Sequence, residues 1–120
     1  MARPGLNFVD CDKLEWQTFG SNPNGRVKMR LLSRDDETGA FSMVCQMPPG
    51  YIRPRAYNTA SCEVFVLEGS FVQNGQEFTR HCYSYTPKEL VTEAMTMNAE
   101  KGCLMLIKAD GPLGLVPVKD

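Results

Sequence analysis

Apolar and polar residues alternate along several stretches of this chain, a pattern typical of β-strands with one face turned to a core. From Phe41 to Met47 every second residue is apolar, and the Pro-Pro-Gly sequence at 48–50 then ends the run. A second run, at 62–68, is apolar on both faces. These periods predict a protein built from strands.

The strand at 62–68 also suggests an assembly. A strand that is apolar on both faces must be covered on both. In a small barrel the inner face lines the core, so the outer face needs a packed segment or a second subunit. We therefore expect a homodimer.

Other elements follow from composition and turn residues. The segment 25–50 reads as two strands joined by a polar turn, and Gln73-Asn74-Gly75-Gln76 predicts a hairpin turn. The segment 115–118 could add an edge strand. Only residues 10–20 invite a helix.

Composition limits the classes of protein that need to be considered. A chain of 120 residues fits one domain, and 13 basic against 14 acidic residues give a net charge of -1. This balance offers no electrostatic case for binding nucleic acid or an anionic membrane. No apolar run could span a bilayer, and the first ten residues lack the apolar core of a signal peptide. We expect a cytoplasmic protein.

Five cysteines are scattered along the chain and never form a Cys-x-x-Cys pair. Their odd number and spacing suggest neither a disulfide framework nor a zinc site. Cys45 and Cys103 alternate with other apolar residues and are expected in the core.

The segment Gly50 to Gly69, GYIRPRAYNTASCEVFVLEG, has the spacing of a motif that begins and ends in glycine. It resembles the first cupin motif, which is glycine, five residues, His-x-His, three or four residues, a carboxylate, six residues and glycine. The resemblance places the two histidine positions at Ala56 and Asn58 and the carboxylate position at Cys62.

A second cupin-like motif follows. In the family it is glycine, five residues, Pro-x-Gly, two residues and histidine. Here His81 stands at the first glycine position, Pro87 is retained, Glu89 stands at the second glycine position and Thr92 at the histidine position.

The resemblance implies an all-β fold, the double-stranded β-helix or jelly-roll barrel of RmlC-like cupins. It covers most of the chain and is strongest to small single-domain cupins and to the cupin half of ChrR-type anti-sigma factors. In this resemblance the segment 100–108 looks like the closing strand of the barrel. It implies one domain over 1–120, with a barrel at about 25–110 between an N-terminal arm and a C-terminal tail.

The four positions where cupins have metal ligands hold poor donors in this chain. Ala56 offers none, Asn58 and Thr92 offer weak neutral oxygens, and Cys62 alone could bind a soft metal strongly. His81 is the only histidine, so a centre built on several imidazoles is impossible within one chain. We expect no tightly bound metal at this location and no cofactor.

Two arginines suggest a different ligand. Arg53 and Arg55 flank Pro54 just before the altered motif positions, and a guanidinium suits a carboxylate or phosphate. Solvated loop charges are the plainer explanation. The tyrosines, Tyr57 among them, could line a pocket or equally belong to the core or rim of a sheet. The pocket candidates are Ala56, Asn58, Cys62, Thr92, Arg53, Arg55 and Tyr57.

Three functions compete on these grounds. The first is binding of a small organic molecule in the barrel. The second is catalysis, as an atypical metal-dependent dioxygenase or a metal-independent isomerase or lyase, although no catalytic residue can be assigned because no acid–base pair is visible. The third is a regulatory or sensor module, as the resemblance to the ChrR cupin half implies.

Overall fold

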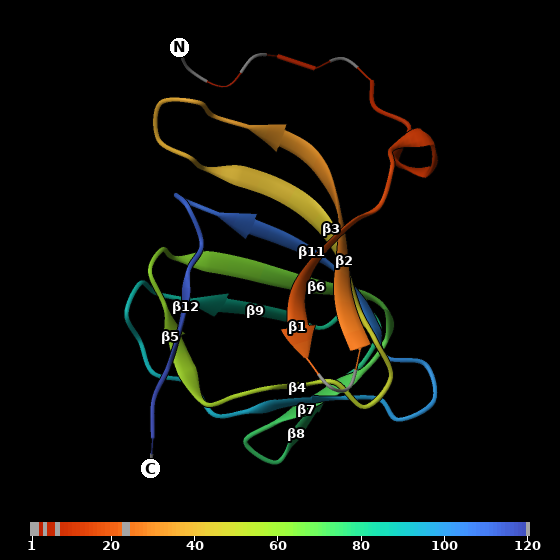
Figure 1. Cartoon of the computed structure of the whole chain (residues 1–120), viewed down its shortest axis with the longest axis vertical. Helices are drawn as coiled ribbons and strands as arrows, with labels where there is room; N and C mark the ends of the chain where they lie inside the picture. The colour runs from red at the N-terminus through yellow and green to blue at the C-terminus, as the bar shows by residue number, and fades with distance from the viewer. Residues whose placement is uncertain (1–2, 4, 7, 23–24, 120) are drawn as a thin grey trace.

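Antiparallel strands form nearly all of the regular structure in the computed structural model, which describes residues 3, 5–6, 8–22 and 25–119 (Figure 1). The largest sheet contains, in spatial order, β1 (Gln17–Asn22), β2 (Gly25–Arg34), β3 (Phe41–Met47), β11 (Cys103–Ala109), β6 (Cys62–Gly69) and β9 (Tyr83–Thr86). A second sheet contains β4 (Ile52–Arg53), β10 (Met95–Met97), β7 (Phe71–Gln73) and β8 (Gln76–Phe78). The strands β12 (Leu115–Pro117) and β5 (Ala56–Asn58) form a third. The predicted all-β class is confirmed.

The core lies on the inner face of these sheets. On β3 the buried residues are Met43 and Cys45, which sit opposite Ile107 and Met105 of β11. This alternation is the one expected from the sequence, because successive side chains of a strand point to opposite faces. Cys103 is also fully buried, so both cysteines predicted in the core are confirmed there.

The strand β11 forms where a strand was predicted, but it lies at the centre of the large sheet. It pairs with β3 on one side and with β6 on the other, with a register irregularity beside Leu104 and Met105. The strand predicted at 115–118 also forms, as β12, and pairs with β5. Strand pairing thus extends beyond residues 25–110 at both ends, since β1 precedes that range.

The hairpin between β7 and β8 turns at Asn74 and Gly75, whose φ angles are 52° and 75°. Two consecutive positive φ angles are what a two-residue hairpin turn requires, and Asn-Gly adopts them readily. The sequence prediction for this turn is confirmed.

The possible helix at residues 10–20 is reduced to one turn of 3₁₀ helix, η1 (Cys11–Lys13). Asp10 caps it by accepting a 3.1 Å hydrogen bond from the Asp12 backbone nitrogen. From Gln17 onward the chain is extended instead, because it pairs with β2. Among the described residues, no helix is long and apolar enough to cross a bilayer.

Candidate ligand-binding site

The backbone turns of the two cupin-like motifs are preserved in the structure. Gly50 and Gly69, at the ends of the first motif, have φ angles of 72° and 76°. His81 and Glu89 stand where the second motif has glycine, and they have φ angles of 73° and 68°. Side chains with a Cβ rarely adopt this left-handed region. The motif geometry is therefore maintained even where glycine is absent.

These turns bring the four former ligand positions together. Ala56 and Thr92 exchange backbone hydrogen bonds of 3.1 and 2.8 Å, and the backbone nitrogen of Glu89 donates to the Asn58 carbonyl over 2.9 Å. The Nδ2 atom of Asn58 in turn lies 3.5 Å from the sulfur of Cys62 as a hydrogen-bond donor. The positions predicted from the motifs thus converge on one region of the barrel interior.

A cavity of about 190 Å³ occupies this interior. Its wall is mainly apolar and rich in sulfur, contributed by Met43, Cys45, Met47, Cys62, Met95 and Met105. Polar side chains also reach it, namely Tyr51, Arg53, Asn58, Gln73, Ser84, Thr86 and Thr92. An apolar enclosure with a few polar groups is the usual composition of a small-molecule site.

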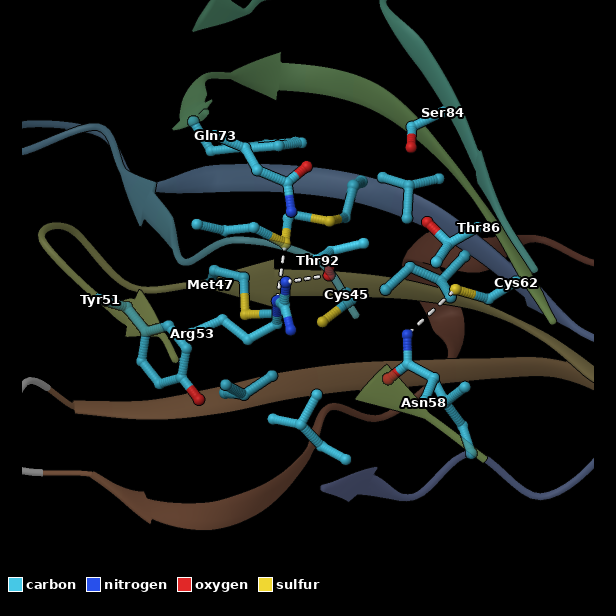
Figure 2. Close-up of a pocket in the computed structure, with 18 of the residues that line it drawn as sticks. Cys45, Met47, Tyr51, Arg53, Asn58, Cys62, Gln73, Ser84, Thr86 and Thr92 are labelled. Carbon is cyan, nitrogen blue, oxygen red and sulfur yellow. Dashed lines mark hydrogen bonds between the residues drawn. The ribbon is translucent and has the colours of Figure 1, made fainter. Parts of the chain in front are cut away.

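Arg53 is the one positively charged side chain among the described residues of this wall, and it is only 8% exposed. One terminal nitrogen donates to Thr92 Oγ1 over 2.7 Å and to the Glu93 carbonyl over 2.9 Å, while Nε donates to the sulfur of Met95 over 2.9 Å. Figure 2 shows the guanidinium turned toward Thr92 within the barrel. The side chain is therefore held by several contacts in one orientation.

Within the described parts of the chain, no carboxylate balances this buried guanidinium. Among the described residues, none lies within ion-pair distance of Arg53, and its second terminal nitrogen has no hydrogen-bond partner. Burial lowers the pKa of Arg53, as expected when a charged group leaves water. Buried charges in proteins are normally paired, so this arrangement is unusual.

Cys62 faces the same cavity and is 6% exposed. Burial raises the pKa of its thiol, and the nearby positive charge of Arg53 and the hydrogen bond from Asn58 partly offset that effect. Because burial is the largest influence, Cys62 is a neutral thiol at neutral pH.

The other predicted pocket residues lie elsewhere. Ala56 is fully buried against Thr92 but does not line the cavity, and its methyl group offers no polar atom. Arg55 stands at a bend after β4, where it forms a 3.2 Å ion pair with Glu93 and donates a hydrogen bond to the Lys119 carbonyl. Tyr57, on β5, is also absent from the cavity wall. Of the two arginines, only Arg53 faces the interior.

Sequence reasoning missed Gln73, Ser84 and Thr86. Ser84 and Thr86 alternate with the exposed Tyr83 and Tyr85 along β9, so period-two alternation could have placed them on the inner face. The pairing of β9 with β6, which sets Thr86 opposite Cys62, is a long-range contact with no local signal.

The residues at the former ligand positions do not form a metal-binding set. Among the described parts of the chain, no group of three or more histidine, cysteine, aspartate or glutamate side chains is placed to hold a metal ion. His81 is exposed, and its ring stacks on Phe65 with centroids 5.8 Å apart. It contributes nothing to the cavity wall.

Comparison with known proteins agrees with this architecture. A "putative dioxygenase" from Nostoc punctiforme is 21% identical with a TM-score of 0.84, and the match covers 99% of this chain and 47% of that one. The polyketide cyclase RemF from Streptomyces resistomycificus is 16% identical with a TM-score of 0.75, covering 97% of this chain and 87% of that one.

The anti-sigma factor ChrR of Rhodobacter sphaeroides, solved in complex with SigE, gives 20% identity and a TM-score of 0.66, covering 84% of this chain and 52% of that one. The chain thus spans about half the length of the Nostoc protein and of that structure. No curated protein sequence matches. The model of the ChrR cupin-like domain matches residues 5–112. The chain therefore belongs to the ChrR cupin-like domain family of the cupins.

Proposed function

We propose that this protein binds a small organic anion inside the barrel, with Arg53 as the anchor for a carboxylate. The observation that carries the proposal is the buried, unpaired guanidinium with one unused terminal nitrogen. A carboxylate in the cavity would supply the missing negative charge. The contacts of Arg53 to Thr92, Glu93 and Met95 fix the fork before a ligand arrives, which reduces the entropy lost on binding.

The size and composition of the cavity restrict the ligand. A volume of about 190 Å³ equals the liquid volume of roughly six water molecules, which limits the ligand to a small compound. The sulfur-rich wall favours an apolar body, because thioether side chains are polarisable and adapt their shape.

We also propose that the Arg53 guanidinium supplies the positive charge that a metal ion would supply at this site, and that no transition metal is bound here. Thr92, at the former histidine position, accepts a hydrogen bond from Arg53 instead of offering a lone pair to an ion. Elemental analysis of untagged protein purified without chelators tests this part. We expect well under one transition metal per chain, and a stoichiometric metal would overturn it.

Catalysis is the second candidate, suggested by the neighbours described as a dioxygenase and a polyketide cyclase. Within the described part of the cavity wall, Cys62 is the best nucleophile, and no aspartate, glutamate or histidine accompanies it. An acid–base route needs a second titrating group at hydrogen-bond distance. Binding therefore ranks above catalysis. A sensor role is suggested by the match to the ChrR cupin-like domain. It would require the same ligand and also a partner protein, so we place it below ligand binding alone.

Calorimetric titration with straight-chain carboxylates from acetate to hexanoate, beside the matching neutral amides, tests the proposal. We expect the carboxylates to bind and the amides not to bind. Arg53→Met should weaken binding about tenfold to a hundredfold, since a charge-assisted hydrogen bond is lost. Arg55→Met is the matched control, because Arg55 pairs with Glu93 outside the cavity. Equal binding by the Arg53→Met variant would overturn the proposal.

A further inference from the structure

A second polar cluster lies on the same cavity wall as the proposed anchor Arg53. Asn58, Cys62, Ser84 and Thr86 all line the cavity. Thr86 stands opposite Cys62 in the pairing of β6 with β9, Ser84 stands opposite Val64, and Asn58 donates to the sulfur of Cys62. Figure 2 shows these four side chains on one side of the cavity, away from Tyr51 and Met47. We name them the thiol–hydroxyl wall.

The hydrogen-bonding capacity of this wall is largely unused. Among the described residues, neither the hydroxyl of Ser84 nor that of Thr86 has a hydrogen-bond partner. The amide of Asn58 donates only to a sulfur atom at 3.5 Å, which is a weak acceptor. Three side chains can therefore donate a hydrogen bond to a ligand.

We propose that the ligand is a short carboxylate that carries a hydroxyl or carbonyl oxygen, with its carboxylate on Arg53 and the second oxygen on the thiol–hydroxyl wall. This inference rests on the function proposed above. A purely hydrocarbon tail would displace water from the hydroxyls and the amide without replacing its hydrogen bonds. Such unpaired polar groups are the main source of strong discrimination in binding sites.

The surroundings disfavour a second negative charge at this wall. Among the described residues that line the cavity, Arg53 is the positively charged one, and in this proposal it binds the ligand's carboxylate. Glu63 and Asp110 lie near enough to Cys62 to raise its pKa through their negative charges. A neutral oxygen therefore suits the wall better than a second carboxylate.

Arg53 and the thiol–hydroxyl wall line one cavity, which has about the volume of six water molecules. A single small ligand can therefore contact both. Five-carbon acids are consequently suitable test ligands, because they can be compared at constant chain length.

The experiment is calorimetric titration of the whole chain with pentanoate, 4-oxopentanoate and pentanedioate. We expect 4-oxopentanoate to bind about tenfold more tightly than pentanoate, the gain expected from one or two hydrogen bonds to otherwise unpaired groups. Pentanedioate should bind no better than pentanoate. In the Ser84→Ala/Thr86→Val double variant, the tenfold ratio should fall to about one or two.

The control is Thr96→Val, a change of the same kind on the outer face of β10, which should keep the ratio. Equal affinity for pentanoate and 4-oxopentanoate, with both lost in Arg53→Met, would overturn this inference and leave the anion-binding function intact. Tighter binding of pentanedioate would also overturn it. Absence of binding by every carboxylate would overturn the proposed function instead. The comparison within the unmodified protein needs no variant to fold.

Discussion

Arg53 donates a 2.7 Å hydrogen bond to the hydroxyl of Thr92, a residue 39 positions later in the chain. The partners of Arg53 are also held without it. The Thr92 hydroxyl donates to the Ala56 carbonyl over 3.4 Å, and the Glu93 carbonyl also accepts from Gln73 over 2.9 Å. The guanidinium is thus added to a polar framework that is already connected.

Because its partners keep other hydrogen bonds, the charge of Arg53 should contribute little to folding. For Arg53→Met without ligand, we expect a free energy of unfolding that is unchanged or higher by up to about 1 kcal/mol, since a buried unpaired charge is replaced by a flexible apolar chain that matches the arginine stem. Urea denaturation measures this. Arg53→Ala should lose about 2 kcal/mol because it leaves a cavity. A loss above about 2 kcal/mol in Arg53→Met would show that Arg53 is structural.

Cys62 should react slowly with thiol reagents. Its burial and raised pKa leave little exposed thiolate, whereas Cys11 and Cys82 are partly exposed. We expect iodoacetamide to label Cys62 last of these three at pH 7, and more quickly at pH 9. Peptide mass spectrometry measures the rates. A bulky adduct on Cys62 should block ligand binding, and rapid labelling would contradict its place inside the barrel.

Stability should decrease at alkaline pH. Burial raises the pKa of Cys45 to about 12 and that of Cys103 to about 11, from an ordinary value of 9.0. Between pH 9 and the raised pKa of each buried thiol, the unfolded chain has released thiol protons that the folded chain retains. The stabilisation that comes from burying neutral thiols is therefore complete below pH 9 and is lost as the pH rises. Each thiol contributes at most about 1.4 kcal/mol per pH unit. In Cys45→Ala this slope, measured by urea denaturation from pH 8 to 10.5, should be smaller, while Cys11→Ala should keep it.

The preserved motif turns predict opposite effects for two substitutions. Glu89→Gly should stabilise the protein by about 0.5–1 kcal/mol. Glycine adopts the left-handed backbone without strain, and we expect this gain to exceed the cost of the greater conformational entropy that glycine gives the unfolded chain. Gly69→Ala should destabilise it by at least about 2 kcal/mol, because a Cβ there would collide with the Gly102 carbonyl as well as strain the backbone. Thermal denaturation of both variants checks the signs. Destabilisation by Glu89→Gly would mean that its side chain holds the turn.

The homodimer expected from the sequence stays a proposal, and the exposed face of β9 is the surface that we propose for it. Tyr83 and Tyr85 of β9 are 54% and 53% exposed, beside the half-buried Phe65 of β6. We propose that this face joins two copies. Sedimentation should give twice the chain mass, and Tyr85→Lys should reduce it to one. Val72→Lys, on the other sheet, is the control and should leave the mass unchanged. A monomer at micromolar concentration in the unmodified protein would contradict the proposal.

Local patterns in the sequence predicted most strands and four of the residues that line the cavity, namely Arg53, Asn58, Cys62 and Thr92. Alternation placed Met43 and Cys45 in the core, and the motif spacing located Asn58, Cys62 and Thr92, since both depend on neighbouring residues only. The same spacing chose Ala56, which is fully buried but does not line the cavity.

The arginines show where such prediction ends. Two residues apart, Arg53 and Arg55 would share a face in a continuous strand. The bend at Arg55 interrupts the strand, so only Arg53 turns inward, beside Met95 of β10. That pairing joins residues about forty positions apart, and no local pattern specifies it.

The central position of β11 also affects how the molecule can be made. Its partners β3 and β6 end at Met47 and Gly69, whereas β11 begins at Cys103. During synthesis β3 and β6 leave the ribosome before β11 does. The edges of β3 and β6 that pair with β11 in the folded protein therefore stay unpaired until β11 has been made. Exposed apolar edges are prone to aggregate during that interval. Production of this protein should therefore benefit from slow translation, low temperature or chaperones, even though the finished barrel encloses its core.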